Sequence, residues 1–253
     1  MLRSLNAIQG FTLEATDGEI GESKDFFFDD REWMIRYLVA DTGKWLPGRL
    51  VLLSLESIGK PDWSSHHFPV KLTKDQIVRS PGIEIDKPVS LQEESKLVQY
   101  YQWPAYWGGI DPLFPAPVGM GAIPAVGDHD VRDRWDTISE EQANPHLRSI
   151  DELIGYVIKA TDGEIGHVED CIADDDTWNI RYFVIDTRNW LPGKKVLVAP
   201  DWIKTIQWSD QTVEVDMTQE QTKNCPEYDA SMPVNRELEV RVYDYFGRPT
   251  YWK

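Results

Sequence analysis

The sequence predicts a mainly β protein made of two similar domains, each a small, strongly curved sheet or barrel followed by a short helical extension. Two observations support this prediction. The stretch Ala-Thr-Asp-Gly-Glu-Ile-Gly begins at Ala15 and returns at Ala160, and a fixed long-period repeat indicates a duplicated structural unit. Each copy also contains about five or six short runs of strand-forming residues, separated by turn residues at short intervals.

The two copies share one register without a gap. An offset of 145 residues carries the Ile-Arg-Tyr of 35–37 onto 180–182 and the Trp-Leu-Pro-Gly of 45–48 onto 190–193. We therefore predict a first domain over 1–107 and a second over 147–253. The segment 108–146 between them begins Gly-Gly and carries five prolines, which indicates a linker. Its charged second half, 128–142, can form one short helix.

The first strand of each copy is predicted at 11–15 and 156–160, where apolar residues alternate with others. An Asp-Gly pair follows in both copies and predicts a tight turn, because Gly tolerates positive φ and Asp accepts hydrogen bonds from nearby amides. Extended structure resumes over 20–28 and 165–173. Gly21 and Gly166 within these runs predict a bulge or a sharp bend.

An acidic turn, Asp29-Asp30 in the first copy, precedes the clearest strand, which is predicted at 33–40 and again at 178–185. Its alternate residues Trp33, Ile35, Tyr37 and Val39 share one apolar face. The Trp-Leu-Pro-Gly stretch then predicts a turn, with Pro fixing φ and Gly closing it. Further strands are predicted at 49–53 and 70–72 in the first copy, and at 194–198 and 213–217 in the second.

Each copy ends in helical sequence. Thr73 with Gln76, and Ser90 with Glu93, have the spacing of a capping box. The second box predicts a helix to about Tyr101, and its copy is predicted at 235–246. A Pro-Xaa-Tyr-Trp tail follows both helices, at 104–107 and 249–252.

Composition narrows the possible function classes. With 41% apolar residues and 11 Trp, the 253-residue chain can build packed cores. Its net charge of −17 disfavours nucleic acid and anionic membranes as partners. No apolar run approaches the roughly 20 residues of a membrane-spanning helix, and the N-terminus lacks a signal-peptide core. Cys171 and Cys225 fit free thiols in a reducing cytoplasm better than a structural disulfide, although a single bridge is the alternative.

The order of motifs resembles one known family. Asp-Gly-Glu-Ile-Gly after a first strand, an acidic turn, a Trp-x-Ile-Arg-Tyr-x-Val-x-Asp-Thr strand and a Leu-Pro-Gly turn are similar to the PRC-barrel domain. That small β-barrel is named for the cytoplasmic part of the photosynthetic reaction centre H subunit. It also occurs in a ribosome-maturation factor and in free-standing bacterial and archaeal proteins. The resemblance covers about 5–72 and 150–217, and the helical tails resemble the extension of stand-alone bacterial members.

The resemblance implies two PRC-type β-barrels in tandem and a non-enzymatic binding role. The membrane helix of the H subunit and the additional domain of the maturation factor have no counterpart in this sequence. Neither activity is therefore transferred residue by residue, and fold alone does not define function.

Several charged positions recur in both copies and are the first candidates for chemistry: Asp17/Asp162, Glu19/Glu164, Asp25/Asp170, Asp29/Asp174, Asp30/Asp175, Arg36/Arg181 and Asp41/Asp186. The Asp before each Gly is expected to serve its turn. Arg36 and Asp41 are expected to form a cross-strand salt bridge rather than an anion clamp. The acidic turn 174–176 offers oxygen ligands for a hard cation but lacks the spacing of a calcium loop, so a solvated turn is expected.

No catalytic constellation is evident in the sequence. None of the five histidines recurs at the offset of 145, and no His/Cys cluster has zinc spacing. We find no nucleophile elbow and no phosphate-binding Gly loop. Cys171 stands where the first copy has Phe26, which indicates core filling. We therefore predict no catalytic residue, no cofactor and no metal site.

The recurring aromatic residues are more informative. Bulky aromatics dominate cores and interfaces alike, and Trp45 and Trp190 stand at a turn, where a core role is harder to arrange. They are predicted to help join the two domains as a pseudo-two-fold pair that mimics a homodimer. The alternative is that they cap the core of their own domain. The candidate interface residues are Trp45, Trp190, Trp107, Trp252, Arg36 and Arg181.

Two function hypotheses follow. The first is a non-enzymatic protein-binding or scaffold module, whose partner is another protein. The second is a small-molecule or metal-binding protein or enzyme that uses a cleft between the halves, built from unshared residues such as His167 and Cys171. A flat aromatic patch favours the first, and a deep pocket that holds those two side chains favours the second.

Overall fold

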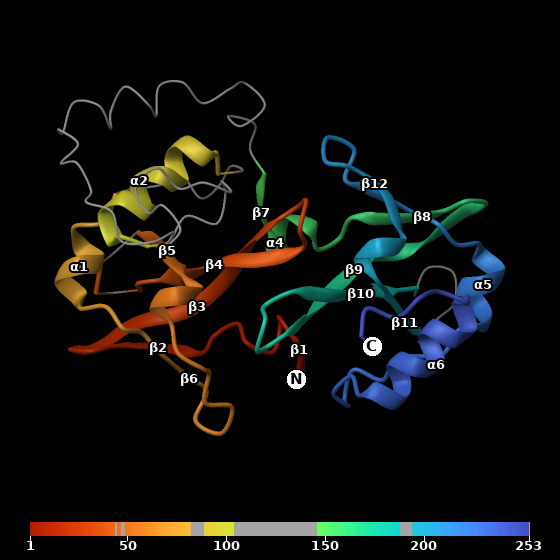
Figure 1. The fold of residues 1–253 in the computed structure, drawn as a ribbon, viewed down its shortest axis with the longest axis horizontal. Coiled ribbons are helices and arrows are strands. Elements are labelled where there is room, and N and C mark those ends of the chain that lie inside the picture. The colour runs from red at the N-terminus through yellow and green to blue at the C-terminus, as the bar shows by residue number, and fades with distance from the viewer. Residues whose placement is uncertain (44, 47–48, 82–88, 104–145, 188–193, 253) are drawn as a thin grey trace, which may run out of the picture.

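The structure is a computed structural model that describes residues 1–43, 45–46, 49–81, 89–103, 146–187 and 194–252. These residues form a mainly β protein with two multi-stranded sheets side by side and helices at the outer ends (Figure 1). The predicted linker over 108–146 lies outside the described residues except for His146, and so does its 128–142 helix.

The first half supplies most of one sheet, in the strand order β5-β4-β3-β2-β6. Its strands are β2 (Thr12–Ala15), β3 (Gly18–Asp29), β4 (Met34–Asp41), β5 (Leu50–Ser54) and β6 (His67–Pro69). Neighbouring strands are antiparallel except β2 and β6, which are parallel. Four of the five strands predicted in this half form, with ends that differ by one or two residues. The strand predicted at 70–72 is wrong, because the chain pairs with β2 three residues earlier, as β6.

The second half repeats this arrangement and extends it, in the order β11-β10-β9-β8-β13-β12. Its strands are β8 (Val157–Ala160), β9 (Gly163–Asp174), β10 (Ile180–Asp186), β11 (Lys195–Val198), β12 (Ile203–Gln207) and β13 (Thr212–Val215). The mainly β prediction is confirmed. Strand pairing among the described residues closes neither sheet into a barrel, and β12 lies at the free end of its sheet.

Gly21 and Gly166 sit where two backbones approach closely. Both have positive φ, 128° and 138°. A Cβ added to Gly21 would lie 1.9 Å from the Asp41 carbonyl oxygen, and one added to Gly166 would lie 2.1 Å from that of Asp186. The predicted bulge is confirmed, because the β2–β3 and β8–β9 registers each shift beside these glycines.

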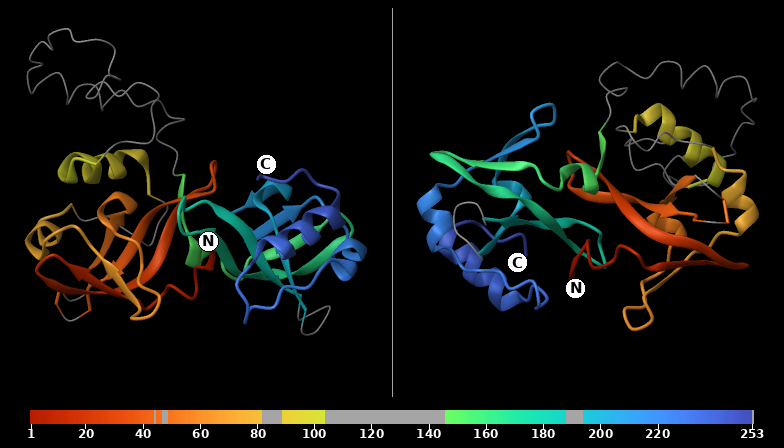
Figure 2. Two further views of the ribbon diagram at one scale, coloured as in Figure 1. Left: turned by 60° about the horizontal axis from the view of Figure 1, so that its bottom comes forward. Right: turned by 180° about the vertical axis from the view of Figure 1, so that it is seen from behind.

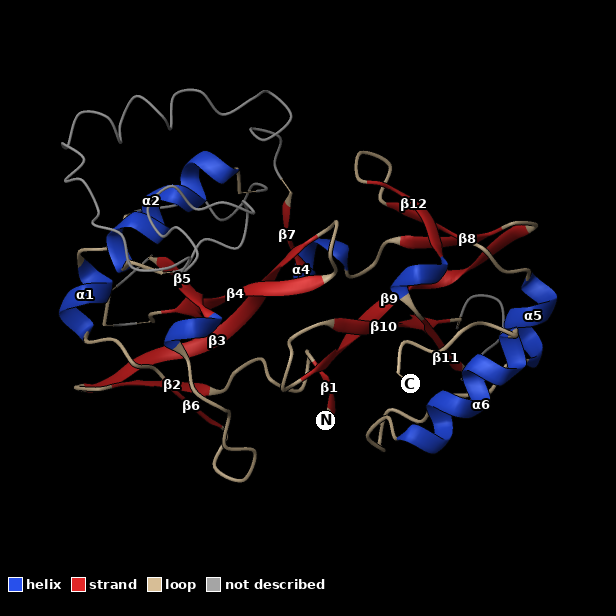
Figure 3. Cartoon of the chain, viewed as in Figure 1, coloured by secondary structure: helices blue, strands red, loops and turns tan. Residues whose placement is uncertain are grey.

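The helices α1, α2, α5 and α6 lie toward the outer ends of the sheets, whereas α4 lies near the middle of the molecule (Figure 3). They are α1 (Lys74–Val78), α2 (Leu91–Tyr101), α4 (Ile150–Leu153), α5 (Gln219–Asn224) and α6 (Arg236–Phe246), with short 3-10 turns at Leu55–Ser57 and Pro200–Trp202. The capping boxes predicted at Thr73 and Ser90 are both formed. The predicted copy of α2 is confirmed as α6, which begins after Asn235.

Each half lends its first strand to the other. Strand β1 (Leu2–Ser4) pairs with β9 of the second half, whereas β7 (Leu147–Ser149) pairs with β3 of the first half. Figure 1 shows both short strands near the middle of the molecule, and the two views in Figure 2 show the same crossing. This reciprocal exchange was not predicted from the sequence.

Both cysteines are free and buried. Cys171 on β9 has no exposed surface and takes the core position that Phe26 occupies in the first half, so the prediction of core filling is confirmed. Burial raises the pKa of the Cys171 thiol well above its usual range. In the described part of the chain, no helix combines the length and the apolar character needed to cross a membrane.

Candidate functional site at the junction of the two halves

An aspartate holds each exchanged strand, buried in the first half and half-buried in the second. Asp25 on β3 accepts hydrogen bonds from the Ser149 hydroxyl (2.6 Å) and the Asp151 amide (3.1 Å), both in the other half. It also accepts one from the Phe26 amide (2.6 Å). The three donors satisfy a carboxylate that is only 6% exposed.

The second half has an equivalent set of hydrogen bonds, and we call each aspartate together with its three donors a clasp. Asp170 on β9 accepts hydrogen bonds from the Ser4 hydroxyl (2.5 Å) and the Asn6 amide (3.2 Å), and from the Cys171 amide (2.7 Å). The pairs Ser4/Ser149 and Asn6/Asp151 are again separated by 145 residues. Asp25 and Asp170 belong to the recurring charged set, but their role at the exchange was not predicted.

Burial raises the pKa of both carboxyl groups. It raises the pKa of Asp25 to about 6, and repulsion from Asp151 adds to the rise against the hydrogen bonds from Ser149, Phe26 and Asp151. Burial also raises the pKa of Asp170. Asn6 stands where the other half has Asp151, so Asp170 lacks that particular source of repulsion.

An arginine next to each clasp ties the exchanged strand back to its own half. The Arg3 guanidinium lies 4.2 Å from the ring centre of Trp63, and that of Arg148 lies 4.3 Å from the ring centre of Trp208. Such cation–π contacts contribute about 0.5–1 kcal/mol when exposed and more when water is excluded. The exchanged strands are therefore anchored on both sides of the junction.

Two tryptophans cross the junction. Trp33 and Trp178 stand at the β3–β4 and β9–β10 turns with positive φ, 56° and 59°. The Ile35 amide donates to the Trp178 carbonyl (2.9 Å), and the Ile180 amide donates to the Trp33 carbonyl (2.7 Å). The turns of the two halves thus bind one another by backbone hydrogen bonds.

The rings of these tryptophans enter the opposite half. Trp178 lies 6.0 Å from the ring of Phe26, and Trp33 lies 5.4 Å from that of Phe183. Both are partly buried against the core. The signal that could have singled them out is their place at the tip of a hairpin, directly after an acidic turn.

The predicted interface tryptophans lie elsewhere or outside the described residues. Trp45 is partly buried with Lys74 of its own half near its ring (5.6 Å). Trp252 contacts Tyr243 and Arg236 of its own half. Trp107 and Trp190 lie outside the described residues. Among the described residues, the tryptophans whose ring contacts cross the junction are Trp33 and Trp178.

Arg36 and Arg181 occupy a second bulge that both halves share. The β3–β4 register shifts between Phe28↔Ile35 and Phe27↔Tyr37, which leaves Arg36 as the extra residue, and Arg181 is extra in the same way. A bulge re-aims the side chain that it carries. Arg36 forms ion pairs with Glu32 and, at 3.9 Å, with Asp29. The predicted Arg36–Asp41 bridge is replaced by these, since Asp41 lies at the far end of β4.

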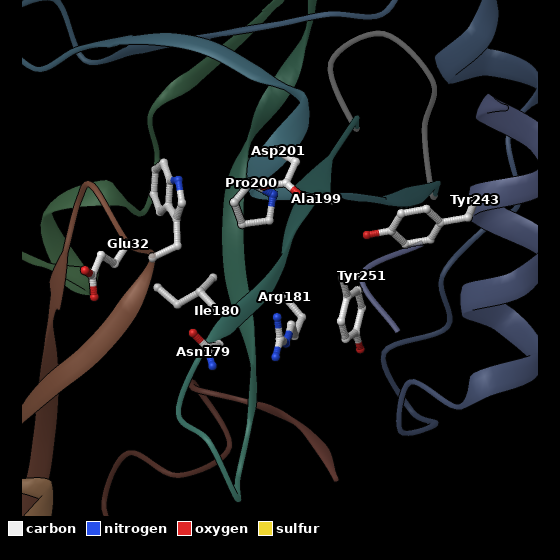
Figure 4. Close-up of a pocket in the computed structure, with 10 residues that line it drawn as sticks. Glu32, Asn179, Ile180, Arg181, Ala199, Pro200, Asp201, Tyr243 and Tyr251 are labelled. Atoms are coloured by element: carbon white, nitrogen blue, oxygen red, sulfur yellow. The ribbon is translucent and has the colours of Figure 1, made fainter. Parts of the chain in front are cut away.

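Arg181 has a different environment. Its guanidinium lies 4.2 Å from the ring centre of Tyr251. In the part of the chain that the structure describes it has no ion pair, and its buried Nε has no hydrogen-bond partner. Figure 4 shows Arg181 beside Asn179 and Ile180, with Glu32 approaching from the first half and Tyr243 from α6.

Arg181 and its neighbours line a pocket of about 80 Å³. The lining residues come from both halves: Glu32, Trp33, Asn179, Ile180, Arg181, Ala199, Pro200, Asp201, Tyr243 and Tyr251. Burial raises the pKa of Tyr243 to about 12, and the charges of Asp201 and Arg181 act on it in opposite directions. The two opposite charges therefore both influence the Tyr243 hydroxyl group.

A wider groove adjoins this pocket along the free strand β12. It has a volume of about 230 Å³ and shares Trp33 and Pro200 with the pocket. Asp30 and Trp33 line it from the first half, and Ile203, Ile206 and Trp208 line it from the second, with Lys204 and Thr205 between them. A groove that mixes polar side chains with isoleucine and tryptophan beside an unpaired strand edge suits an extended peptide.

The residues of the second hypothesis are not brought together at the junction. Cys171 is enclosed in the core, whereas the His167 imidazole Nε2 lies 3.9 Å from the Asp186 carboxylate. Neither residue lines the two pockets described above. The acidic turn 174–176 gathers three carboxylates, and Arg3 and Lys60 form ion pairs with Asp175 and Asp176.

A buried tyrosine–glutamate pair supports the strand behind each arginine. The Tyr37 hydroxyl donates to Glu94 on α2 (2.6 Å), and the Tyr182 hydroxyl donates to Glu239 on α6 (2.9 Å). Glu94 is fully buried and Glu239 is 2% exposed. These pairs fix the helical extensions to the sheets, because a buried carboxylate without donors is costly.

A region of 102 residues, about the length of one repeat, is 29% identical to an uncharacterised protein of Deinococcus radiodurans. The match covers 40% of this chain and 36% of that protein, so the chain matches little more than a third of the relative's length. No protein-family model matches the chain.

Proposed function

We propose that this chain is a non-enzymatic protein-binding or scaffold module made of two PRC-type barrels that are joined as an intramolecular pseudo-dimer. The motif order in both copies supports the family, and the reciprocal exchange of β1 and β7 supports the pseudo-dimer. The free, buried thiols are in keeping with a reducing compartment such as the cytoplasm.

The observation that carries the binding role is the groove along β12. Strand β12 pairs with β13 on one side only among the described strands. Its neighbouring groove has Ile203, Ile206 and Trp208 on one wall and Trp33 on the other. An extended segment of another protein can add a strand at such an edge, with backbone hydrogen bonds for affinity and the groove for side-chain selection.

A site-specific photo-crosslinker tests this role. Placed at exposed Thr205, on the outer strand, it is expected to give discrete adducts in the native cell. Ile206→Asp should remove those adducts, because it replaces an apolar side chain that lines the groove with a charged one. Val240 on α6, which is 39% exposed, is the matched position for a control crosslinker and for a control Val240→Asp. No adduct at Thr205, or the same adducts at Val240, would contradict the proposed binding site.

A second candidate function is small-molecule binding in a cleft between the halves. The pocket beside Arg181 favours it, since its walls come from both halves and it contains an arginine without an acidic partner among the described residues.

A further inference from the structure

The pocket beside Arg181 contains two opposite charges, neither of which has an ion-pair partner among the described residues. Arg181 lines one side and exposed Asp201 lines another. Among the described residues, neither forms an ion pair, either with each other or with a third group, and Asp201 also has no hydrogen bond. The buried Nε of Arg181 has no hydrogen-bond partner in the described part of the chain. Leaving such a donor unpaired costs free energy unless a ligand supplies an acceptor.

The pocket is a feature of the second half alone. Glu32 neutralises Arg36 in the first half, but the residue at the matching position beside Arg181 is Thr177. Asn179 and Tyr243 line the pocket where the first half has Met34 and Val98. Compared with Arg36 in the first half, Arg181 therefore has one acidic neighbour fewer and two polar neighbours more.

The shape of the pocket limits its ligand. About 80 Å³ is roughly the space of three water molecules, which a molecule of a few heavy atoms can fill. The Tyr251 ring covers one face of the Arg181 guanidinium, so the edge of the guanidinium remains for a planar anion. Trp33 and Ile180 add apolar surface for a small alkyl group.

We propose that this pocket binds a small zwitterion with the chemistry of a free α-amino acid. Its carboxylate would meet the Arg181 guanidinium and its ammonium group would meet the Asp201 carboxylate. A simple anion satisfies only the first charge and a simple amine only the second. This inference does not depend on the protein-binding role of the β12 groove.

Calorimetric titration with small probes tests the proposal. Glycine and alanine are expected to bind. N-acetylglycine, which lacks the ammonium charge, and glycinamide, which lacks the carboxylate, are expected to bind about tenfold more weakly or not at all, because each leaves one charge unpaired. No binding of glycine or alanine would overturn the proposal. Equal binding of either blocked probe would also overturn it and would indicate a site for a simple anion or a simple amine.

Variants link the binding to the two charges. Arg181→Met and Asp201→Asn should each weaken glycine binding by about tenfold or more. Thr177→Glu should do the same while keeping the arginine, because it restores the acid that Arg36 has in Glu32. Arg79→Met and Asp210→Asn make the same charge changes at exposed sites outside the pocket, and should leave binding unchanged. Loss of binding in these controls, or its retention in Thr177→Glu and Asp201→Asn, would contradict the assignment.

Discussion

The contacts that join the two halves recur at an offset of 145 residues, whereas the surroundings of the paired arginines do not. The Asp25 and Asp170 clasps, the crossing tryptophans and the bulges that carry Arg36 and Arg181 are shared. Arg36 is neutralised by Glu32, but Arg181 borders a pocket. The difference indicates that the duplicated residues hold the molecule together, and that the residues changed between copies are the place to look for a specialised function.

The largest expected effect comes from the crossing tryptophans. Trp33→Ala and Trp178→Ala should each lower the free energy of unfolding by about 3–5 kcal/mol, since each removes a large side chain that packs across the junction. Denaturant titration measures the loss. Met232→Ala, at a side chain that is 59% exposed, is the control and should change little. Losses that differ greatly between the two tryptophans would show that the junction is not symmetrical in energy.

The clasps should give the molecule a pH-dependent stability. The pKa of Asp25 is about 6 in the folded protein against 3.8 ordinarily, so the folded state keeps a proton that the unfolded state has lost. The contribution is complete below pH 3.8 and disappears as the pH rises through 6. It amounts to roughly 3 kcal/mol in total, of which about 2 kcal/mol is lost between pH 4 and pH 7.

Unfolding titrations of the wild type and Asp25→Asn across this pH range measure the contribution, which the variant should lack. Asp151→Asn should reduce it by removing a repulsion, and Asn6→Asp should introduce a similar repulsion beside Asp170. An unchanged pH slope in Asp25→Asn would assign the effect to other groups.

A smaller effect is expected at the buried tyrosine–glutamate pairs. Tyr182→Phe removes a hydrogen bond to Glu239 and should lower the free energy of unfolding by about 1–2 kcal/mol, with Tyr251 and Arg236 still bound to the carboxylate. Tyr245→Phe, whose exposed hydroxyl donates to the Gln221 carbonyl, is the matched control and should cost less. Equal losses would mean that burial of the Glu239 carboxylate adds nothing to the strength of the bond.

Local signals predicted local structure well. The capping residues Thr73 and Ser90 begin helices as expected, and Gly21 marks a bulge because its backbone touches that of Asp41. These features depend on neighbours in sequence or on one adjoining strand. Alternation likewise predicted most of the longer strands, although β12 and the short strands β1, β6 and β7 were missed.

The junction could not be predicted in the same way. The repeat treats each copy as a unit, and Leu2–Ser4 would fit beside β3 of its own half as well as beside β9 of the other, because the two slots have the same sequence pattern. Which slot is filled depends on tertiary packing. Trp45 and Trp190 became interface candidates because they stand at a turn. Among the described residues, the tryptophans whose rings cross the junction are Trp33 and Trp178, which also stand at turns.

The exchange also means that the first sheet cannot be completed until part of the second half has been synthesised. Helix α2 of the first half ends at Tyr101, yet the strand that pairs with β3 from the other half is not reached until Leu147. At typical translation rates of about 5–20 residues per second, those 46 residues take roughly 2–9 seconds. During that interval the nascent first half exposes an unpaired strand edge beside Phe27 and Phe28, and a neighbouring nascent chain on the same messenger could occupy it.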